Sequence, residues 1–284
     1  MSTKKSFVTK KRIKSWCSYA SKVIVGLFII FPVLVCICSA LKTESQLLTS
    51  RGWELILLPA NPTLENFIEA WTTIPLGKFL MNTAIQCTIV IISQVILCSF
   101  AAYALVFFDF KGKELLFAFI LFTMMIPGDV VIISNYIQIQ AWHLTDTHLG
   151  MALPHLVGGM GIFLMRQFYL TIPHELRDAA AVDGCGDFRF FMSVALPLSI
   201  PSLSALSIRE FVIIYNRYFW PLLVTNKEAK RTIQLGIALL RSNEFVQVTL
   251  DMASAAICII PVVFVFIIGQ KYIIKGMTAG AVKG

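Results

Sequence analysis

Residues 173–197 read PHELRDAAAVDGCGDFRFFMSVALP, a polar, alanine-rich stretch between long apolar runs. A connector in an apolar chain needs only to be short and polar, whereas this one is patterned as two short helices around a glycine turn. Pro173 suits the first turn of a helix, where the missing amide hydrogen of proline is harmless. Asp183 and Gly184 should end that helix, because glycine tolerates the left-handed conformation of a C-terminal cap. The stretch is therefore interpreted as a docking element.

The first of these helices should present acids and then alanines. Glu175 and Asp178 fall in its early turns, where carboxylates interact favourably with the helix N-terminus. Ala179 and Ala180 are strong helix formers with little side-chain bulk, so they leave a smooth strip that another protein can approach closely. An ordinary amphipathic helix on the membrane surface is the alternative interpretation.

The second helix should begin at Asp187, whose side chain can cap it, and carry an apolar, aromatic face over residues 188–194. Leu196 and Pro197 should end it, since proline disfavours a helical conformation in the residue before it. The chain would then enter the next apolar run.

The apolar runs on both sides indicate a membrane protein. Of the 284 residues, 57% are hydrophobic and 14% are charged, against about 25% charged residues in soluble domains. Crossing a bilayer takes about 20 mostly apolar residues. Six runs meet that length, at about 20–41, 80–107, 114–139, 148–170, 200–224 and 252–274. The expected fold is an all-α polytopic bundle of six transmembrane helices, with a kink or break in the third at Pro127, Gly128 and Asp129.

The distribution of Lys and Arg predicts the orientation. Residues 1–22 hold seven Lys or Arg and no acid, so this segment should stay in the cytoplasm. Six spans return the C-terminus to the same side, with fifteen Lys and Arg inside, seven outside and two within the fifth span. The expected organisation is a basic segment 1–22, a six-helix membrane domain 23–274 with the cytoplasmic loop 171–199, and a cytoplasmic tail 275–284.

The sequence contains none of the short motifs that carry common enzyme chemistry. It lacks a GxxxxGK[ST] phosphate loop, an HExxH zinc motif and a GxSxG nucleophile elbow. Its seven cysteines form no CxxC pair and its four histidines are scattered, so neither a metal site nor a cofactor is expected. The excess positive charge follows from the sidedness of membrane loops, so nucleic acid is not an expected partner.

The fifth span contains four polar side chains, Arg209, Glu210, Asn216 and Arg217. A charge near the bilayer centre costs about 2.5–3.5 kcal/mol on insertion scales, so these groups should face protein or water. Glu210 and Arg217 are seven residues apart, on one helical stripe. Two interpretations stay open: the groups satisfy one another or a partner helix, or Arg209 and Arg217 line a translocation route that favours an anionic or highly polar solute.

Amides recur at helical spacing in two other spans. Asn82 and Gln86 share a face of the second span, and Asn135 and Gln138 share a face of the third. Such pairs form hydrogen bonds between helices more often than they bind solute. Asn82 and Asn135 are kept as possible pathway residues beside that structural interpretation.

The docking stretch has a specific resemblance. Asp-Ala-Ala-x-x-Asp-Gly from residue 178, followed after nine residues by Val-Ala-Leu-Pro, resembles the EAA loop of permease subunits of binding-protein-dependent ABC importers. Asp178 stands where a glutamate is usual in that family. The matching positions are Ala179, Ala180, Asp183, Gly184, Leu196 and Pro197. The resemblance implies that the loop forms coupling helices that sit in a cleft of the ATP-hydrolysing subunit.

The resemblance extends over residues 16–284, including FLMRQF at 163–168 and YFWPLL at 218–223. The tail KGMTAGAVKG is similar to that of carbohydrate-type permeases related to the second maltose permease subunit. This implies that Lys275, Gly280 and Lys283 reach the ATPase subunits, and fraying is the alternative for so small and basic a tail. The partners implied are a second permease subunit in a heterodimer, two ATPase subunits, an extracytoplasmic solute-binding protein and the lipid bilayer of a bacterial inner membrane.

The function implied is import of a sugar, oligosaccharide or polyol derivative, with ATP hydrolysis residing in partner subunits. Residues 133–136, ISNY, also resemble glycerol-phosphate permeases, so an anionic phosphoester is the alternative solute. A secondary transporter or a membrane enzyme is the alternative of another class. The first should show two similar halves with matching broken helices, and the second should place paired carboxylates or a histidine cluster at one depth.

Overall fold

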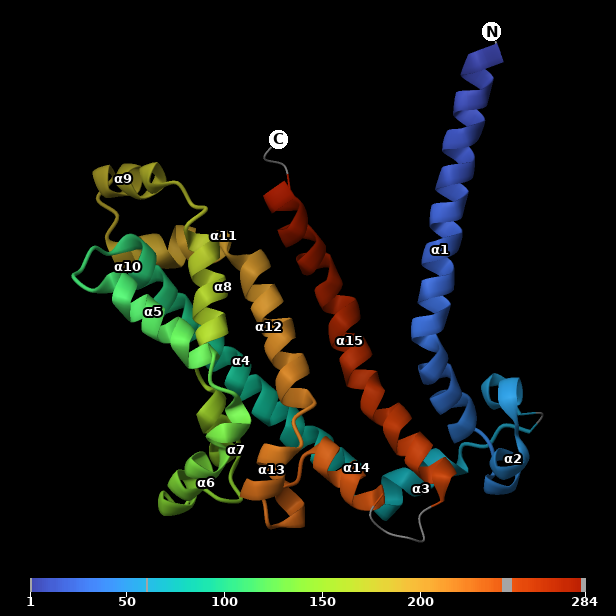
Figure 1. Cartoon of the computed structure of the whole chain (residues 1–284). Helices are drawn as coiled ribbons and strands as arrows, with labels where there is room; N and C mark the ends of the chain where they lie inside the picture. Colours follow the sequence, from blue (N-terminus) through green and yellow to red (C-terminus); the bar gives the residue numbers. More distant parts are fainter. Residues whose placement is uncertain (1, 60, 242–246, 282–284) are drawn as a thin grey trace. The chain divides into compact units, whose positions relative to one another are not determined.

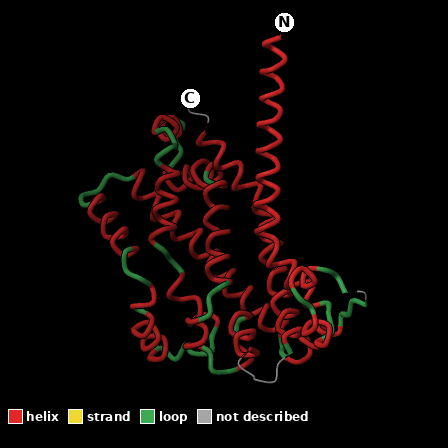
Figure 2. Tube along the Cα trace, turned by 45° about the vertical axis from the view of Figure 1, so that its right-hand side comes forward, coloured by secondary structure: helices red, strands yellow, loops and turns green. Residues whose placement is uncertain are grey.

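The computed structural model describes residues 2–59, 61–241 and 247–281. Helices and loops make up these residues, and Figure 2 shows no strand among them. The chain divides into two compact units. One consists of Met1–Ile74 with Leu240–Ile259, and the other of Pro75–Leu239 with Ile260–Gly284.

The first unit is built around a buried lysine. Its elements are α1 (Ser2–Ala40), α2 (Glu44–Thr49), η1 (Gly52–Ile56), α3 (Glu65–Thr73) and the start of α15 (Val248–Ala281). The ammonium of Lys42 donates to Oγ of Ser50 at 3.4 Å and to the carbonyl oxygen of Glu54 at 2.7 Å. Asn66 donates to the carbonyl oxygens of Ala40 and Lys42, both at 2.7 Å. These bonds fold the segment that follows α1 back onto the end of that helix.

The carboxylate of Glu44 accepts hydrogen bonds at the start of α15. Its oxygens lie 3.4 Å from the amide nitrogen of Val248, 3.3 Å from that of Thr249 and 3.0 Å from the Thr249 hydroxyl. The first amides of a helix have no partner within the helix, and a carboxylate there also interacts favourably with the helix dipole. Glu44 therefore caps α15 from a distant point in the sequence.

The second unit is a helical bundle around α4 (Leu76–Phe107), which packs against α8 and α12. In the first half of this unit, α4 is followed in the chain by α5 (Lys113–Met124), η2 (Gly128–Val130), α6 (Ile132–Ala141), α7 (His148–Ala152), η3 (Leu153–His155) and α8 (Gly159–Tyr169). In the second half, α8 is followed by α9 (His174–Val182), α10 (Asp187–Phe190), the π-helical turn η4 (Phe191–Ala195), α11 (Leu196–Leu198), α12 (Ile200–Tyr215), α13 (Phe219–Val224), η5 (Glu228–Lys230) and α14 (Ile233–Arg241). Within this unit, α9 and α10 lie at one end and α6 and α13 at the other (Figure 1).

Helices α4 and α8 approach each other closely at Gly161. A Cβ atom there would lie 2.7 Å from Sγ of Cys98 and 2.9 Å from Oε1 of Gln94. Such distances are shorter than van der Waals contact, so the approach requires glycine. Toward the α9 end of the unit, aromatic rings instead of small residues fill the contact between these two helices.

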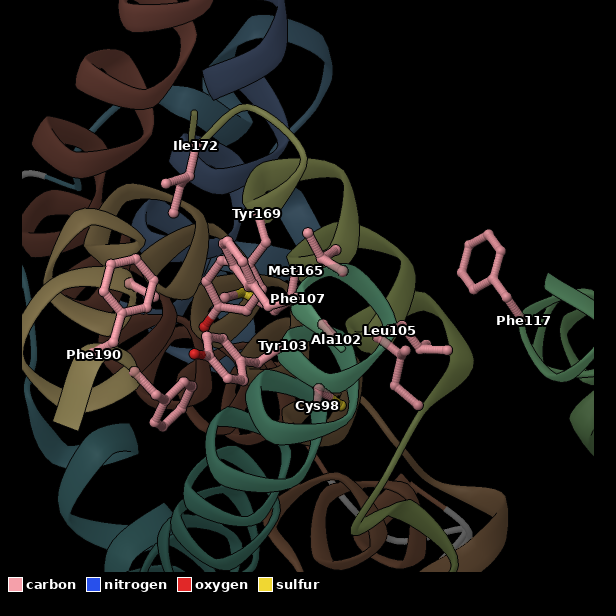
Figure 3. Close-up of a cluster of buried hydrophobic side chains, with 14 of the residues drawn as sticks. Cys98, Ala102, Tyr103, Leu105, Phe107, Phe117, Met165, Tyr169, Ile172 and Phe190 are labelled. Atoms are coloured by element: carbon pink, nitrogen blue, oxygen red, sulfur yellow. The ribbon is translucent and has the colours of Figure 1, made fainter. Parts of the chain in front are cut away.

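An aromatic cluster forms the core at the α9 end of this unit. Figure 3 shows Tyr103 and Phe107 of α4 beside Tyr169 and Phe190. The ring centroids of Tyr103 and Phe107 are 4.8 Å apart, and those of Phe107 and Phe190 are 5.7 Å apart. Offset and edge-to-face pairs of this kind contribute about 0.5–1.5 kcal/mol beyond the area they bury. Helix α9 packs against this cluster through Ala180.

Three of the expected spans are confirmed as single helices within the described residues. They are Ser18–Ala40, Leu76–Phe107 and Val248–Lys271. The second begins at Leu76 rather than near residue 80, directly after Pro75. Two bent pairs also meet the length and composition of a span, His148–His155 with Gly159–Tyr169 at 52° and Asp187–Leu198 with Ile200–Tyr215 at 71°.

The remaining predicted spans need correction. The third, 114–139, is not one helix, because α5 ends at Met124 and α6 begins at Ile132. The predicted break at Pro127 and Gly128 is confirmed, since proline lacks the amide hydrogen that a continuing helix needs. The fifth, 200–224, ends at Tyr215, and 219–224 form a separate helix. The count of six spans stays a prediction.

Two predicted terminal segments are parts of longer helices. The basic segment 1–22 belongs to α1, which begins at Ser2. The tail from residue 275 continues α15 through Ala281. The segments between the expected spans are partly helical, since α2, α3 and α14 fall within 42–79 and 225–251.

Candidate functional site

The docking stretch forms the helix that the sequence predicts. Helix α9 begins at His174, with Pro173 as its N-cap. Gly184 has φ +74°, and its amide donates to the carbonyl oxygen of Ala181 at 3.0 Å. The amide of Cys185 donates to the carbonyl oxygen of Ala180 at 2.9 Å. This pair of bonds is the Schellman motif, and it confirms that Asp183 and Gly184 end the helix.

Helix α9 presents one face to the surface, while Ala180 on its other face is partly buried against the aromatic cluster and Arg177 is half-buried. It has no buried residue, and Glu175, Asp178 and Ala179 are open to the surface. Val182 is 88% exposed, and Phe188 just beyond the turn is 67% exposed. Exposed apolar side chains beside free carboxylates are typical of a surface that a partner covers.

Arg177 fastens this exposed helix to the unit. Its Nη1 donates to the carbonyl oxygen of Phe107, the last residue of α4, at 2.6 Å. Its Nη2 and Nε donate to Oδ1 of Asp187 at 2.8 Å and 3.2 Å. The hydrogen bonds from the guanidinium to Asp187 raise the pKa of Arg177. Arg177 was not predicted from the sequence, because its partners lie 10 and 70 residues away and leave no local pattern.

The second helix of the stretch differs from the prediction in its start and its end. Gly186, not Asp187, is the N-cap of α10, because the Asp187 carboxylate is engaged by Arg177. The backbone carbonyl of Asp187 also accepts from the Tyr103 hydroxyl at 3.1 Å. Helical structure continues past Leu196 and Pro197 to Leu198, and the chain bends by 71° there. The π-helical turn η4 ends at Ala195, two residues before Pro197, whose missing amide hydrogen leaves a carbonyl of the preceding turn without a donor.

The acid of the fifth span is buried in a polar contact between α4 and α12. Glu210 is 4% exposed and forms an ion pair with Arg209. Nε2 of Gln94 donates to Oε2 of Glu210 at 3.2 Å and to the carbonyl oxygen of His155 at 3.0 Å. Arg209 and Glu210 thus neutralise each other, which matches the interpretation that the polar groups of the fifth span satisfy one another.

Asn216 and Arg217 lie beyond the end of α12. Asn216 is its C-cap and donates to the carbonyl oxygen of Val212 at 2.8 Å. Glu210 and Arg217 therefore do not share a helical stripe, and that expectation was wrong. Arg217 is partly buried, and Asp129 and Glu210 are the acids that act on it electrostatically. Whether Arg209 and Arg217 line a route stays a prediction.

Asn82 is engaged within the unit. Its amide nitrogen donates to the carbonyl oxygens of Ala229 and Arg231, both at 2.9 Å. Its Oδ1 accepts from Nε2 of His148 at 3.0 Å. These bonds match the structural interpretation of the amides in the second span, because they leave the side chain no free donor.

Asn135 has different surroundings from Asn82. It lines a pocket of about 320 Å³ with Gln138, Ile139 and Trp142 of α6 and its C-cap and with Leu153 and Pro154 of η3. The pocket is lined by no charged side chain. Asn135 is thus a predicted pathway residue that the structure places on a cavity.

Lys275 and Gly280 lie on α15, and Lys283 lies outside the described residues. In the described part of the chain, no three His, Cys, Asp or Glu side chains are grouped so as to hold a metal ion.

Comparison with known proteins decides the family. Residues 94–279 match the family described as the binding-protein-dependent transport system inner membrane component. The chain belongs to this family. The arabinooligosaccharides transport system permease protein AraQ of Halalkalibacterium halodurans is 32% identical over 96% of this chain and 98% of its own length. The sn-glycerol-3-phosphate transport system permease protein UgpE of Brucella abortus is 32% identical over 89% of this chain and 93% of its own.

A solved structure shares the fold of this binding-protein-dependent permease. It is a chain of a bacterial ABC transporter involved in the import of the acidic polysaccharide alginate, with a TM-score of 0.80 at 21% identity. The match covers 93% of this chain and 98% of that one. The chain is thus a membrane-spanning permease component of an ABC importer, as the resemblance of residues 173–197 predicted.

Proposed function

We propose that the chain is one of two permease subunits of an importer for a sugar, oligosaccharide or polyol derivative. A second permease subunit completes the pore, two ATPase subunits drive it, and an extracytoplasmic binding protein delivers the solute. The N- and C-termini and α9 lie in the cytoplasm, and the membrane is the bacterial inner membrane. The observation that carries this proposal is the exposed helix α9, fastened by Arg177, in a chain of this family.

Force on α9 would reach the bundle along three connections. The helix follows α8 in the chain and precedes α10 through α12, and Arg177 ties it to the end of α4. ATPase closure against α9 would therefore move α4, α8 and α12 together and change which side of the membrane the pore faces. No covalent chemistry is assigned to this chain, since ATP hydrolysis resides in the partner subunits.

The solute class draws support from the relatives' names, which include arabinooligosaccharide and sn-glycerol-3-phosphate systems. A neutral glycosyl solute is favoured over a phosphoester. Arg209, a cation that would attract phosphate, is already paired with Glu210 in the structure. A glycerol-phosphate importer is the second candidate, because relatives of both kinds share a similar identity with the chain.

The coupling role is tested with Ala179→Arg, which places a bulky charge on the exposed face of α9. The matched control is Gln167→Arg, which adds the same charge at an exposed position on α8. We expect ATP-driven uptake in proteoliposomes, and co-purification of the ATPase subunits, to fall at least about tenfold in the first variant only. Normal uptake by well-inserted Ala179→Arg protein would refute the docking role.

A further inference from the structure

One face of α6 carries two amides and an indole around a cavity. Asn135, Gln138 and Trp142 are spaced i, i+3 and i+7, which places them on the same side of the helix. They line the pocket of about 320 Å³ opposite Leu153 and Pro154. Ligand pockets have about 300–1,000 Å³, mostly apolar walls and a few polar groups. The pocket meets each of these conditions.

The two amides of this pocket have no hydrogen-bond partner among the residues that the structure describes. Across residues 2–59, 61–241 and 247–281, the side chains of Asn135 and Gln138 form no hydrogen bond with another residue. Asn135 is half-buried and Gln138 is exposed, so a ligand can reach both amides. These two side chains are therefore available to an external group, and their spacing lets one ligand meet both.

The pocket is held in shape from behind. Ile139 is one of its lining residues and packs with Met151, Trp220 and Val224 in a small buried cluster. The indole nitrogen of Trp220 donates to the carbonyl oxygen of Met151 at 3.0 Å. A cavity whose wall is fixed before binding loses less conformational entropy when a ligand enters.

We propose that this pocket is a subsite for one neutral glycosyl unit of the imported solute, an inference that rests on the proposed function. Trp142 is 51% exposed, so its ring is open to stack against the C–H groups of a sugar. The electron-rich face of an aromatic ring attracts such weakly positive hydrogens. The two amides supply both donors and acceptors for the hydroxyls of the same unit. A phosphoester would find no cation among the lining residues.

The position of the pocket suits the entry of solute. Helix α6 lies at the end of its unit opposite to α9 (Figure 1). With α9 in the cytoplasm, this end belongs to the extracytoplasmic side, where the binding protein releases its cargo. The subsite would then hold the first sugar unit before the pore changes its access.

Direct binding tests the subsite in the full-length chain, co-purified with its partner subunits and placed in nanodiscs. The probes are arabinotriose, xylotriose, maltotriose and sn-glycerol 3-phosphate, measured by calorimetry. We expect at least one neutral trisaccharide to bind saturably. Trp142→Ala and the double variant Asn135→Leu/Gln138→Leu should each weaken binding at least about tenfold. The control Trp53→Ala, another exposed tryptophan, should leave it unchanged.

Three results would overturn the subsite. They are no binding of any trisaccharide, binding that the pocket variants leave unchanged, or tighter binding of the phosphoester at these residues. Loss of the second permease subunit from the double variant would identify the face as a protein contact and would also overturn it. Failure of ATP-driven uptake in the wild-type complex would instead count against the proposed function, since binding is measured without ATP.

Discussion

The side-chain amides of α4 and those of α6 have the same chemistry, but the α4 amides form hydrogen bonds within the chain and the α6 amides line a pocket. On α4, Gln86 and Gln94 donate to the carbonyl oxygens of Met151 in α7 and His155 in η3, which precede the bend into α8. On α6, Asn135 and Gln138 face a cavity. The difference lies in what stands opposite each helix. A bent helix leaves carbonyls without a partner, and the nearby amides of α4 satisfy them.

The hydrogen bonds from α4 explain how a bent span remains stable in an apolar environment. Ser93 adds a third bond, from its hydroxyl to the carbonyl oxygen of Leu156 at 2.9 Å. Irregular backbone at membrane depth persists only where protein or water satisfies its polar groups. The α4 amides therefore stabilise the bundle through hydrogen bonds, whereas the α6 amides form none within the described part of the chain.

The largest expected effect is that of Gln94→Leu. The substitution removes the donor to His155 and leaves the buried Glu210 carboxylate with one fewer hydrogen bond. Because bonds to charged groups contribute about 1.5–3 kcal/mol, we expect the free energy of unfolding to fall by about 2 kcal/mol. Denaturation of the purified chain in mixed micelles measures this change. Gln138→Leu, which removes the same group from α6, serves as the control and should leave stability unchanged.

The next effect is expected at the close approach of α8 to α4. In Gly161→Ala the new methyl group would meet Cys98 and displace Oε1 of Gln94, at an expected cost of about 1.5 kcal/mol, because both neighbours are side-chain atoms that can shift. The matched control is Gly158→Ala, whose Cβ would lie 3.4 Å from the Gln94 amide, an ordinary contact. Thermal unfolding of the two variants measures the difference. Equal melting temperatures would show that Gln94 does not depend on this packing.

Asn82→Ala should have a smaller effect. It removes the donors to Ala229 and Arg231 and the acceptor for His148. Hydrogen bonds between helices in membrane proteins contribute about 0.6 kcal/mol on average, so a loss of about 1 kcal/mol is expected. Uptake by the folded fraction should keep its KM. A raised KM with unchanged stability would instead make Asn82 a pathway residue and remove the distinction between the two sets of amides.

The sequence predicts the local features of this chain well. The proline and glycine at 127 and 128 predicted the break before α6, and Gly184 predicted the end of α9, because both effects act through the backbone of the residue itself. The docking role of α9 was predicted by residue pattern and stays to be tested. The family itself was recognisable from the same pattern.

Features that depend on distant partners were not predictable. Helical spacing is the same for Asn82 and Gln86 as for many solute-binding pairs, and nothing local indicates that His148 and Arg231 stand opposite. Arg177 was missed for the same reason. The end of the fifth span at Tyr215 was also missed, because the apolar run continues past Asn216 and Arg217 into α13.

The smallest expected effect on stability is that of Asn135→Leu/Gln138→Leu. Neither amide has a hydrogen bond to lose within the described part of the chain, so the free energy of unfolding should change by less than about 0.5 kcal/mol. Transport should respond instead, with a raised KM and an unchanged maximal rate if the pocket holds the solute equally before and during the change of access. Unfolding and uptake measured on one preparation separate the two effects. A loss of stability as large as that of Gln94→Leu would mean that the α6 amides are structural, like those of α4.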